Sequence, residues 1–97
     1  MEPALHHCPA YNNLLDAARS KVDMLSYLWL LDILQVLEQK VHQALQQYWH
    51  DRNRIHFQIA YEEALAELPA PDWVRDKGFL IDGLAELTRR FMAWLQI

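Results

Sequence analysis

A heptad pattern of apolar residues runs through the middle of the chain. Every third or fourth residue is apolar along a seam made of Tyr27, Leu30, Leu34, Leu37, Val41, Ala44 and Tyr48. Residues three and four apart lie on one face of an α-helix, so this alternation is typical of a helix that keeps one stripe against a neighbouring helix. The pattern predicts one long helix from about Met24 to about Trp49.

The two halves of this predicted helix differ on the face opposite the seam. In the second half that face is polar and rich in glutamine. In the first half it carries the apolar residues Leu25, Leu28, Trp29 and Val36. A helix that is apolar nearly all round must be covered on both sides. We therefore expect the segment 24–37 to lie in the middle of the domain or of an oligomer.

Beyond Tyr48 the seam loses its phase, and the polar stretch 50–53 separates it from a second apolar stripe. Polar residues of this kind favour a turn or a helix cap, so we expect a break there and an antiparallel helical hairpin. One continuous helix with a stutter is the alternative. Pro69 and Pro71 end the second helix, because proline cannot continue the hydrogen-bond ladder. A last helix is predicted from about Phe79 to the end of the chain.

Residues that form turns are scarce in this chain. It holds two glycines and four prolines, with neither type between Pro9 and Pro69. Since β-strands need turns between them, this favours helices throughout. We predict an all-α fold, a small antiparallel bundle of four to five helices built on the long central helix. Residues 1–8 are expected to form a flexible N-terminal tail, and residues 9–97 a single domain.

The composition predicts that the protein has a binding partner. Of 97 residues, 53% are hydrophobic, which is above the usual fraction for a globular domain. A chain of this length has little interior volume, so we expect some apolar surface to lie against a second copy, as in a homodimer, or against another protein. Leu25, Leu28, Trp29 and Val36 are the predicted interface residues. The predicted function is that of a non-enzymatic accessory, adaptor or regulatory subunit that acts through an apolar helix surface.

The charge balance argues against a general nucleic-acid-binding protein. The formal net charge is −4, whereas such a protein needs a basic face to neutralise phosphates. The one cysteine, Cys8, excludes an intrachain disulfide and fits a reducing compartment. The most apolar stretch, 24–37, contains Asp32 and is shorter than the roughly twenty residues that a membrane-spanning helix needs. The N-terminus lacks the pattern of a signal peptide. We expect a cytoplasmic protein without a membrane-spanning segment.

An alternative function rests on the sequence Arg52-Asn53-Arg54-Ile55-His56. It resembles the Arg-Asn-x-x-x-His element of HEPN-type helical ribonucleases, with a shorter spacing between the first arginine and the histidine. The resemblance implies that Arg52, Arg54 and His56 bind or cleave RNA. Histidine can move a proton near neutral pH, and arginine can stabilise negative charge that develops on phosphate. A polar turn between two helices is the other interpretation of the same residues.

Metal-ligand residue types also occur along the chain. The candidates are His42, His50 and His56 together with Glu38, Glu62 and Glu63. Glu38 and His42 lie away from the heptad seam, so we expect them in solvent and predict no metal site. His6, His7 and Cys8 could bind stray transition metals, but nothing nearby completes a site. Aromatic residues at helical spacing are expected in the core or an interface, so no cofactor is predicted. No phosphate-binding glycine loop or nucleophile elbow occurs.

Overall fold

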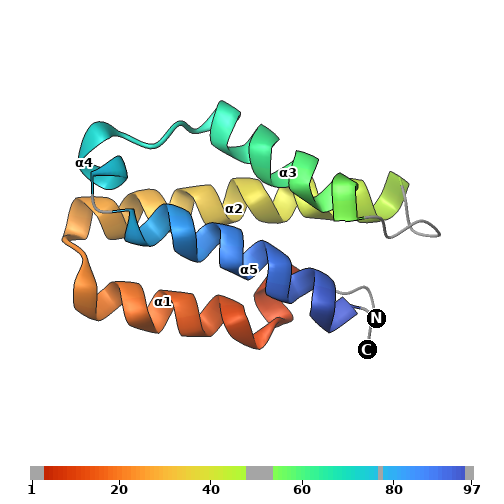
Figure 1. The fold of residues 1–97 in the computed structure, drawn as a ribbon, viewed down its shortest axis with the longest axis horizontal. Helices are drawn as coiled ribbons and strands as arrows, with labels where there is room; N and C mark the ends of the chain where they lie inside the picture. Colours follow the sequence, from red (N-terminus) through yellow and green to blue (C-terminus); the bar gives the residue numbers. More distant parts are fainter. Residues whose placement is uncertain (1–3, 48–53, 77, 96–97) are drawn as a thin grey trace.

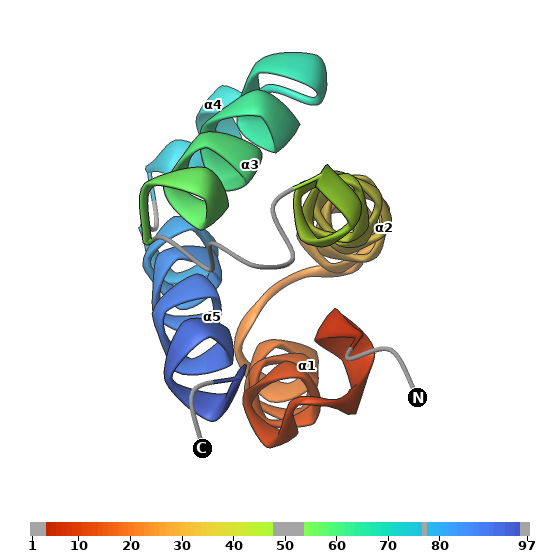
Figure 2. The same cartoon turned by 90° about the vertical axis from the view of Figure 1, so that its right-hand side faces the viewer.

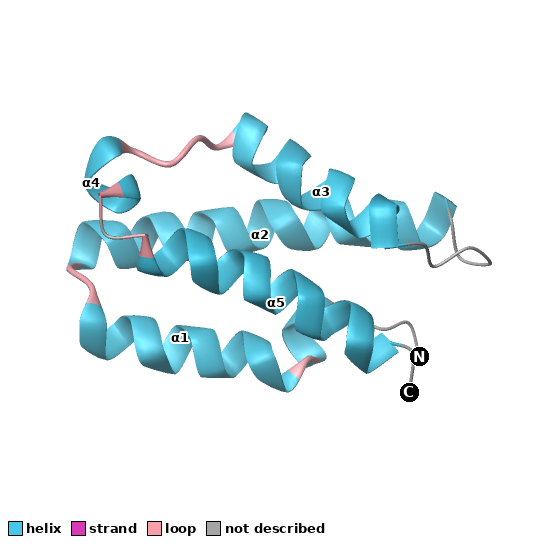
Figure 3. Ribbon diagram, in the orientation of Figure 1, coloured by secondary structure: helices cyan, strands magenta, loops and turns pink. Residues whose placement is uncertain are grey.

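Helices form the regular structure of this protein. The computed structural model describes residues 4–47, 54–76 and 78–95. The elements in these segments are a short 3-10 turn, η1 (Leu5–His7), and the helices α1 (Pro9–Lys21), α2 (Met24–Gln47), α3 (Arg54–Glu67), α4 (Asp72–Arg75) and α5 (Phe79–Leu95). The prediction of an all-α fold built on a long helix is confirmed. Figure 3 shows that loops occupy only short stretches between the helices.

The helices pack on one side of α2. Helix α3 lies along α2, and α1 lies along α5 (Figure 1). Viewed down the long axis, α3, α5 and α1 follow one another around part of α2 (Figure 2). The opposite side of α2 is not covered by any described helix in this view. The central helix therefore has one face in the core and one face outside.

Helices α2 and α3 form an antiparallel hairpin. They run in opposite directions side by side and make the most extensive contact between any two elements (Figure 1). A single continuous helix through both segments is therefore excluded. The stretch 50–53, where we predicted the break, lies outside the described residues.

Local sequence signals explain where several helices begin and end. Pro9 occupies the first turn of α1, where its missing N–H costs no hydrogen bond. Asp23 caps α2, because its Oδ1 accepts a hydrogen bond from the backbone N–H of Ser26 at 2.7 Å. Pro71 lies directly before α4. Gly78 adopts φ +67°, a left-handed conformation that favours glycine, and this allows the sharp turn from α4 into α5.

The core is built from the predicted seam and from the inward faces of α3 and α5. The seam residues Leu30, Leu34 and Leu37 are fully buried. Phe57 of α3 and Phe91 of α5 meet edge to face, with ring centroids 5.9 Å apart. Burial of apolar side chains such as these supplies the free energy that holds the helices together.

Residues 4–8 belong to the folded domain. The sequence predicted a flexible tail over residues 1–8, but Leu5 is 1% exposed and Cys8 is 2% exposed. They are three residues apart across the turn of η1, so both apolar side chains point inward together. His6 Nδ1 lies 2.5 Å from Glu38 Oε1 of α2, which ties η1 to the central helix. The predicted boundary at residue 9 is therefore too late, because a tail that carries Leu5 and Cys8 has apolar groups to bury.

Candidate functional site

Large apolar side chains that remain exposed concentrate at one end of the molecule. Met24, Leu25 and Leu28 in the first turns of α2 are 77%, 66% and 49% exposed, and Trp73 of α4 is 44% exposed. Helix α4 lies at the same end of the molecule as the start of α2 (Figure 1). We call these four residues the apolar end. Of the well-exposed large apolar residues in the described chain, only Ile59 of α3 lies elsewhere.

The outward face of α2 continues from the apolar end with very little charge. Its exposed positions are Met24, Leu25, Leu28, Asp32, Gln35, Gln39, His42, Gln43 and Gln46. Among these nine described positions Asp32 is the one acidic or basic residue apart from the histidine. By contrast, the exposed positions of α3 include Glu62, Glu63 and Glu67. The cores of protein interfaces are depleted in charge, so this face of α2 has the composition of a contact surface.

The four interface residues predicted from the sequence divide into two pairs. Leu25 and Leu28 lie on the outward face of α2 and are exposed. Trp29 is only 7% exposed and belongs to the core of its own chain, and Val36 packs half-buried against that core. The structure therefore places Leu25 and Leu28 together on the surface, with Trp29 and Val36 on a different side of the helix.

A second inward stripe of α2 explains the position of Trp29 and Val36. These two residues share their side of the helix with Ile33 and Lys40, at spacings of three and four. Lys40 Nζ lies 3.1 Å from Glu67 Oε2 of α3, so this stripe faces α3. The heptad seam alone implies one neighbouring helix. A second neighbour widens the buried arc of α2 to include the large ring of Trp29.

Sequence reasoning missed two residues of the apolar end. Met24 precedes the periodic seam, and Trp73 lies on α4, which has one turn and therefore no periodic pattern. The signal that could have found Trp73 is its place between prolines and charged residues, where a tryptophan has few apolar neighbours in sequence to pack against.

Two buried polar atoms lie next to the apolar end without a hydrogen-bond partner in the described chain. They are the hydroxyl oxygen of Ser26 and the indole Nε1 of Trp29, both in the first half of α2. A buried polar group without a partner costs roughly 1–3 kcal/mol. The first half of α2 therefore combines exposed apolar groups with unpaired buried polar groups.

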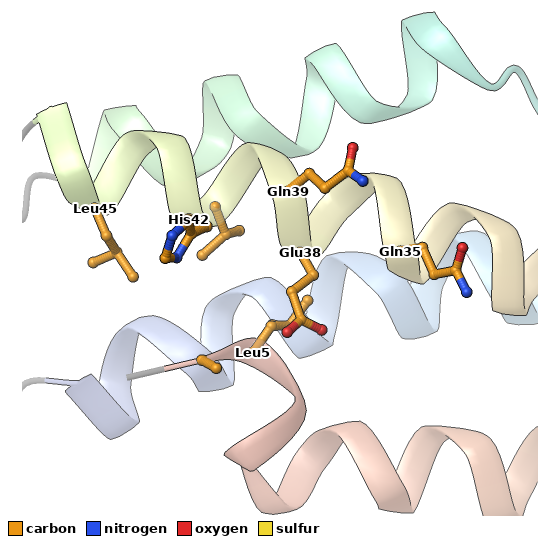
Figure 4. Close-up of a pocket in the computed structure, with 8 residues that line it drawn as sticks. Leu5, Gln35, Glu38, Gln39, His42 and Leu45 are labelled. Carbon is orange, nitrogen blue, oxygen red and sulfur yellow. The ribbon is translucent and has the colours of Figure 1, made fainter. Parts of the chain in front are cut away.

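A shallow groove runs along α2 beside η1. It has a volume of about 330 Å³ and is lined by Ala4, Leu5, Gln35, Glu38, Gln39, Val41, His42 and Leu45. Figure 4 shows Glu38 pointing from α2 toward the turn that carries Leu5. The Glu38 carboxylate already contacts His6, and His42 Nε2 lies 3.1 Å from Gln46 Nε2. Two polar side chains of this groove, Glu38 and His42, are thus engaged in contacts within the chain.

Two tyrosines with raised pKa values, Tyr61 and Tyr11, lie in contacts between parts of the fold. Burial raises the pKa of Tyr61, and the negative charge of Asp82 raises it further. The Tyr61 hydroxyl donates a hydrogen bond of 3.4 Å to the Ile81 carbonyl, which joins α3 to α5. Burial also raises the pKa of Tyr11, with a further contribution from the charge of Glu38. These shifts reflect packing of phenol rings between helices.

The candidate metal ligands do not gather in the described part of the chain. No group of three or more His, Cys, Asp or Glu side chains there could hold a metal ion. Glu62 and Glu63 are exposed on α3, and Cys8 is buried. His50 lies outside the described residues.

Two of the three residues of the HEPN-like alternative lie at the start of α3. Arg52 lies outside the described residues, and Arg54 is the first residue of α3, with His56 in its first turn. The side chains of Arg54 and His56 are not among those described. The ribonuclease hypothesis therefore stays a prediction from sequence.

The comparisons with known proteins give no family for this chain. No family model, no curated protein and no solved structure matches it. In the described segments, no helix has the length and apolar character required to cross a membrane.

Proposed function

We propose that this protein is a non-enzymatic interaction protein that binds a protein partner through the apolar end and the adjoining outward face of α2. The observation that carries the proposal is the gathering of Met24, Leu25, Leu28 and Trp73 at one end of the molecule. Scattered single apolar residues on a surface need no explanation, whereas a cluster is typical of a binding site.

The energetics of the apolar end favour binding. Burying such a side chain fully contributes about 1.5–3 kcal/mol, and the share that belongs to its exposed area is unrealised while that area stays in water. Association costs on the order of 4–15 kcal/mol in lost freedom, so a few dispersed side chains would not suffice. Four such side chains at one end of the molecule, covered together by one partner, can offset that cost.

The low charge of the outward face of α2 supports the same proposal. A partner that covers this face must displace water from Asp32, but from no Lys, Arg or Glu side chain among the exposed positions. Desolvating an unpaired charge is costly, and glutamine side chains can instead form hydrogen bonds across an interface. The role expected is that of an accessory, adaptor or regulatory subunit.

A pair of polar substitutions tests this function. The double variant Leu25→Gln, Leu28→Gln removes two exposed apolar side chains without adding charge. We expect tagged wild-type protein to capture a partner from lysate of its own host, and the double variant to lose at least about nine-tenths of that capture. Circular dichroism should show the helical content and the thermal midpoint of the wild type, because both side chains lie outside the core.

The chain offers a matched control for these substitutions. Ile59 is 44% exposed on a helix, close to the 49% of Leu28, but lies away from the apolar end. Ile59→Gln should capture the same partner as the wild type. Equal capture by all three proteins would contradict the proposed function, and so would the absence of both a captured partner and self-association.

A further inference from the structure

We propose that residues 4–8 form a strap that opens away from α2 while the helices stay folded, and that this opening controls access to the Cys8 thiol. The strap consists of the turn η1 and the residue on each side of it, Ala4 and Cys8. In the closed state, which the structure shows, Leu5 and Cys8 are buried. The inference goes beyond the proposed function, because the strap contacts α2 at Glu38 and not at the apolar end.

The backbone hydrogen bonds of the strap do not hold it on α2. In the described chain these bonds join residues of the segment 4–11 to one another, from His7 N–H to the Ala4 carbonyl, from Cys8 N–H to the Leu5 carbonyl, and from Tyr11 N–H to the Cys8 carbonyl. All three can persist when the strap moves away from α2. Opening the strap therefore avoids the cost of unpaired backbone groups, which opening a helix incurs.

The junction between Cys8 and Pro9 provides the hinge. Cys8 has extended backbone angles, φ −70° and ψ 130°, as expected of a residue that precedes proline. Rotation about φ of Cys8 moves the preceding residues and leaves the Cys8 carbonyl in its hydrogen bond with Tyr11. The Cys8 side chain then stays with α1, while residues 4–7 move away from it.

Few contacts keep the strap closed. Leu5 is fully buried and lines the same groove as Val41 and Leu45 of α2. The polar contact between His6 and Glu38 joins side chains that are 49% and 30% exposed, and contacts of this kind add little stability. By contrast, α5 buries six residues. Segments held by few buried side chains open before the whole domain unfolds, so the strap should open separately.

Opening changes what the solvent reaches. The strap supplies Ala4 and Leu5 to the lining of the groove of about 330 Å³ along α2. When these residues move away, the groove widens, and Val41 and Leu45 become exposed together with the Cys8 thiol. Withdrawing one leucine and one thiol from a core is unfavourable. We expect the closed state to outnumber the open state by on the order of 10²–10³-fold.

Labelling of the thiol tests the strap. Cys8 is the one cysteine of the chain, so its reaction reports the open state. The reagent is dithiobis-nitrobenzoic acid, which forms a mixed disulfide with the thiol and releases a coloured thiolate. At one fixed pH and low urea, the rate should be on the order of 10²–10³-fold below that of the unfolded chain in concentrated urea. Low concentrations of urea should change this rate little, because opening the strap exposes little surface.

Substitutions at Leu5 should act on this rate directly. Leu5→Ala should raise the labelling rate at low urea at least about thirtyfold. Leu5→Val removes a single methylene, so it should raise the rate about fourfold and tests the strap even if Leu5→Ala does not fold. Leu65→Ala is the control. Leu65 packs half-buried on α3, which lies on a different side of α2 from η1 (Figure 2). This control should lower the urea midpoint and leave the rate at low urea unchanged.

Three results would overturn the strap. The first is a labelling rate that follows global unfolding, measured by circular dichroism, at every urea concentration. The second is a rate without urea equal to that of the unfolded chain, which would mean that Cys8 is never covered. The third is a rate that Leu65→Ala raises as much as the Leu5 substitutions do, or that Leu5→Val leaves unchanged. None of these results bears on Leu25 and Leu28, so the proposed function is tested independently.

Discussion

At the scale of single residues, the first half of α2 departs from the usual arrangement of polar and apolar groups. Leu25 and Leu28 lie in solvent, while the Ser26 hydroxyl and the Trp29 indole N–H are buried without a partner in the described chain. Ordinary helices bury apolar stripes and hydrogen-bond their buried polar groups. Sites that depart from these rules are typically those that function constrains rather than stability.

Ser26 gives a test of this interpretation. Ser26→Ala removes a buried hydroxyl without a partner and replaces it with the strongest helix former, so we expect the free energy of unfolding to rise by about 1 kcal/mol. Urea denaturation followed by circular dichroism measures this. The backbone N–H of Ser26 keeps its bond to Asp23, because the substitution leaves the main chain intact.

Thr88 serves as the control for Ser26. It is also buried, but its hydroxyl donates a hydrogen bond of 3.0 Å to the Leu84 carbonyl. Thr88→Val removes a satisfied hydroxyl and should lower stability or leave it unchanged. A loss of stability in Ser26→Ala equal to that in Thr88→Val would show that the Ser26 hydroxyl is satisfied after all.

At the scale of elements, a close helix contact joins α1 to α5. Gly83 lies there, and a Cβ at this position would come within 2.5 Å of Leu14 Cδ1. Glycine inside a helix is destabilising by about 0.5–1 kcal/mol relative to alanine. The close approach of the two helices supplies the packing that offsets this cost.

Gly83→Val should therefore destabilise the protein by about 1–3 kcal/mol, because a branched side chain overpacks the contact with Leu14. In the double variant Gly83→Val, Leu14→Ala, the space left by Leu14 admits the valine. We expect its loss of stability to be smaller than the sum of the two single losses, as a double-mutant cycle in urea measures. Additive losses would mean that the two side chains do not meet.

The sequence predicts well where the helices lie along the chain, and less well which helices pack against one another. The 3–4 spacing identifies α2 and α5, and the prolines at 69 and 71 correctly end α3. Trp29 shows the limit of this prediction. A heptad seam indicates a single neighbouring helix, whereas a further side of α2 packs against α3. Which side of a helix a second neighbour covers depends on tertiary packing, and a periodic pattern in one segment does not contain that information.

The candidate site, too, is predicted from the sequence only in part. Leu25 and Leu28 stand out in the sequence because they break the polar pattern of their face. Trp73 joins them only through the path of the chain from α3 through α4 to α5, which brings α4 to the start of α2 (Figure 1). Composition indicated surplus apolar surface, but its gathering at one end depends on this tertiary arrangement.

At the scale of the whole molecule, η1 decides where the domain begins. The chain forms an elongated body of 39 × 25 × 18 Å, so each short segment covers a large share of its core. Leu5 and Cys8 are among the most buried side chains, and Leu5 lines the same groove as Val41 and Leu45 of α2. A segment of this kind acts as part of the core although it lies at the chain terminus.

Removal of residues 1–8 should therefore destabilise the protein by about 3–5 kcal/mol, because it withdraws a buried leucine and a buried thiol from the core. That is a large fraction of the roughly 5–15 kcal/mol by which a domain is stable. Urea denaturation of the truncated and full-length chains measures the difference. A truncated chain as stable as the full one would restore the flexible tail predicted from sequence.

Two single variants divide the effect of this truncation between apolar burial and the polar contact. Leu5→Ala should account for about 2–4 kcal/mol of the loss, because it empties a fully buried position. His6→Ala should cost under about 1 kcal/mol, since both side chains of the His6–Glu38 contact are partly exposed to solvent. The same urea denaturation measures both values. A large loss from His6→Ala alone would assign the stabilisation to the polar contact instead of to the buried leucine.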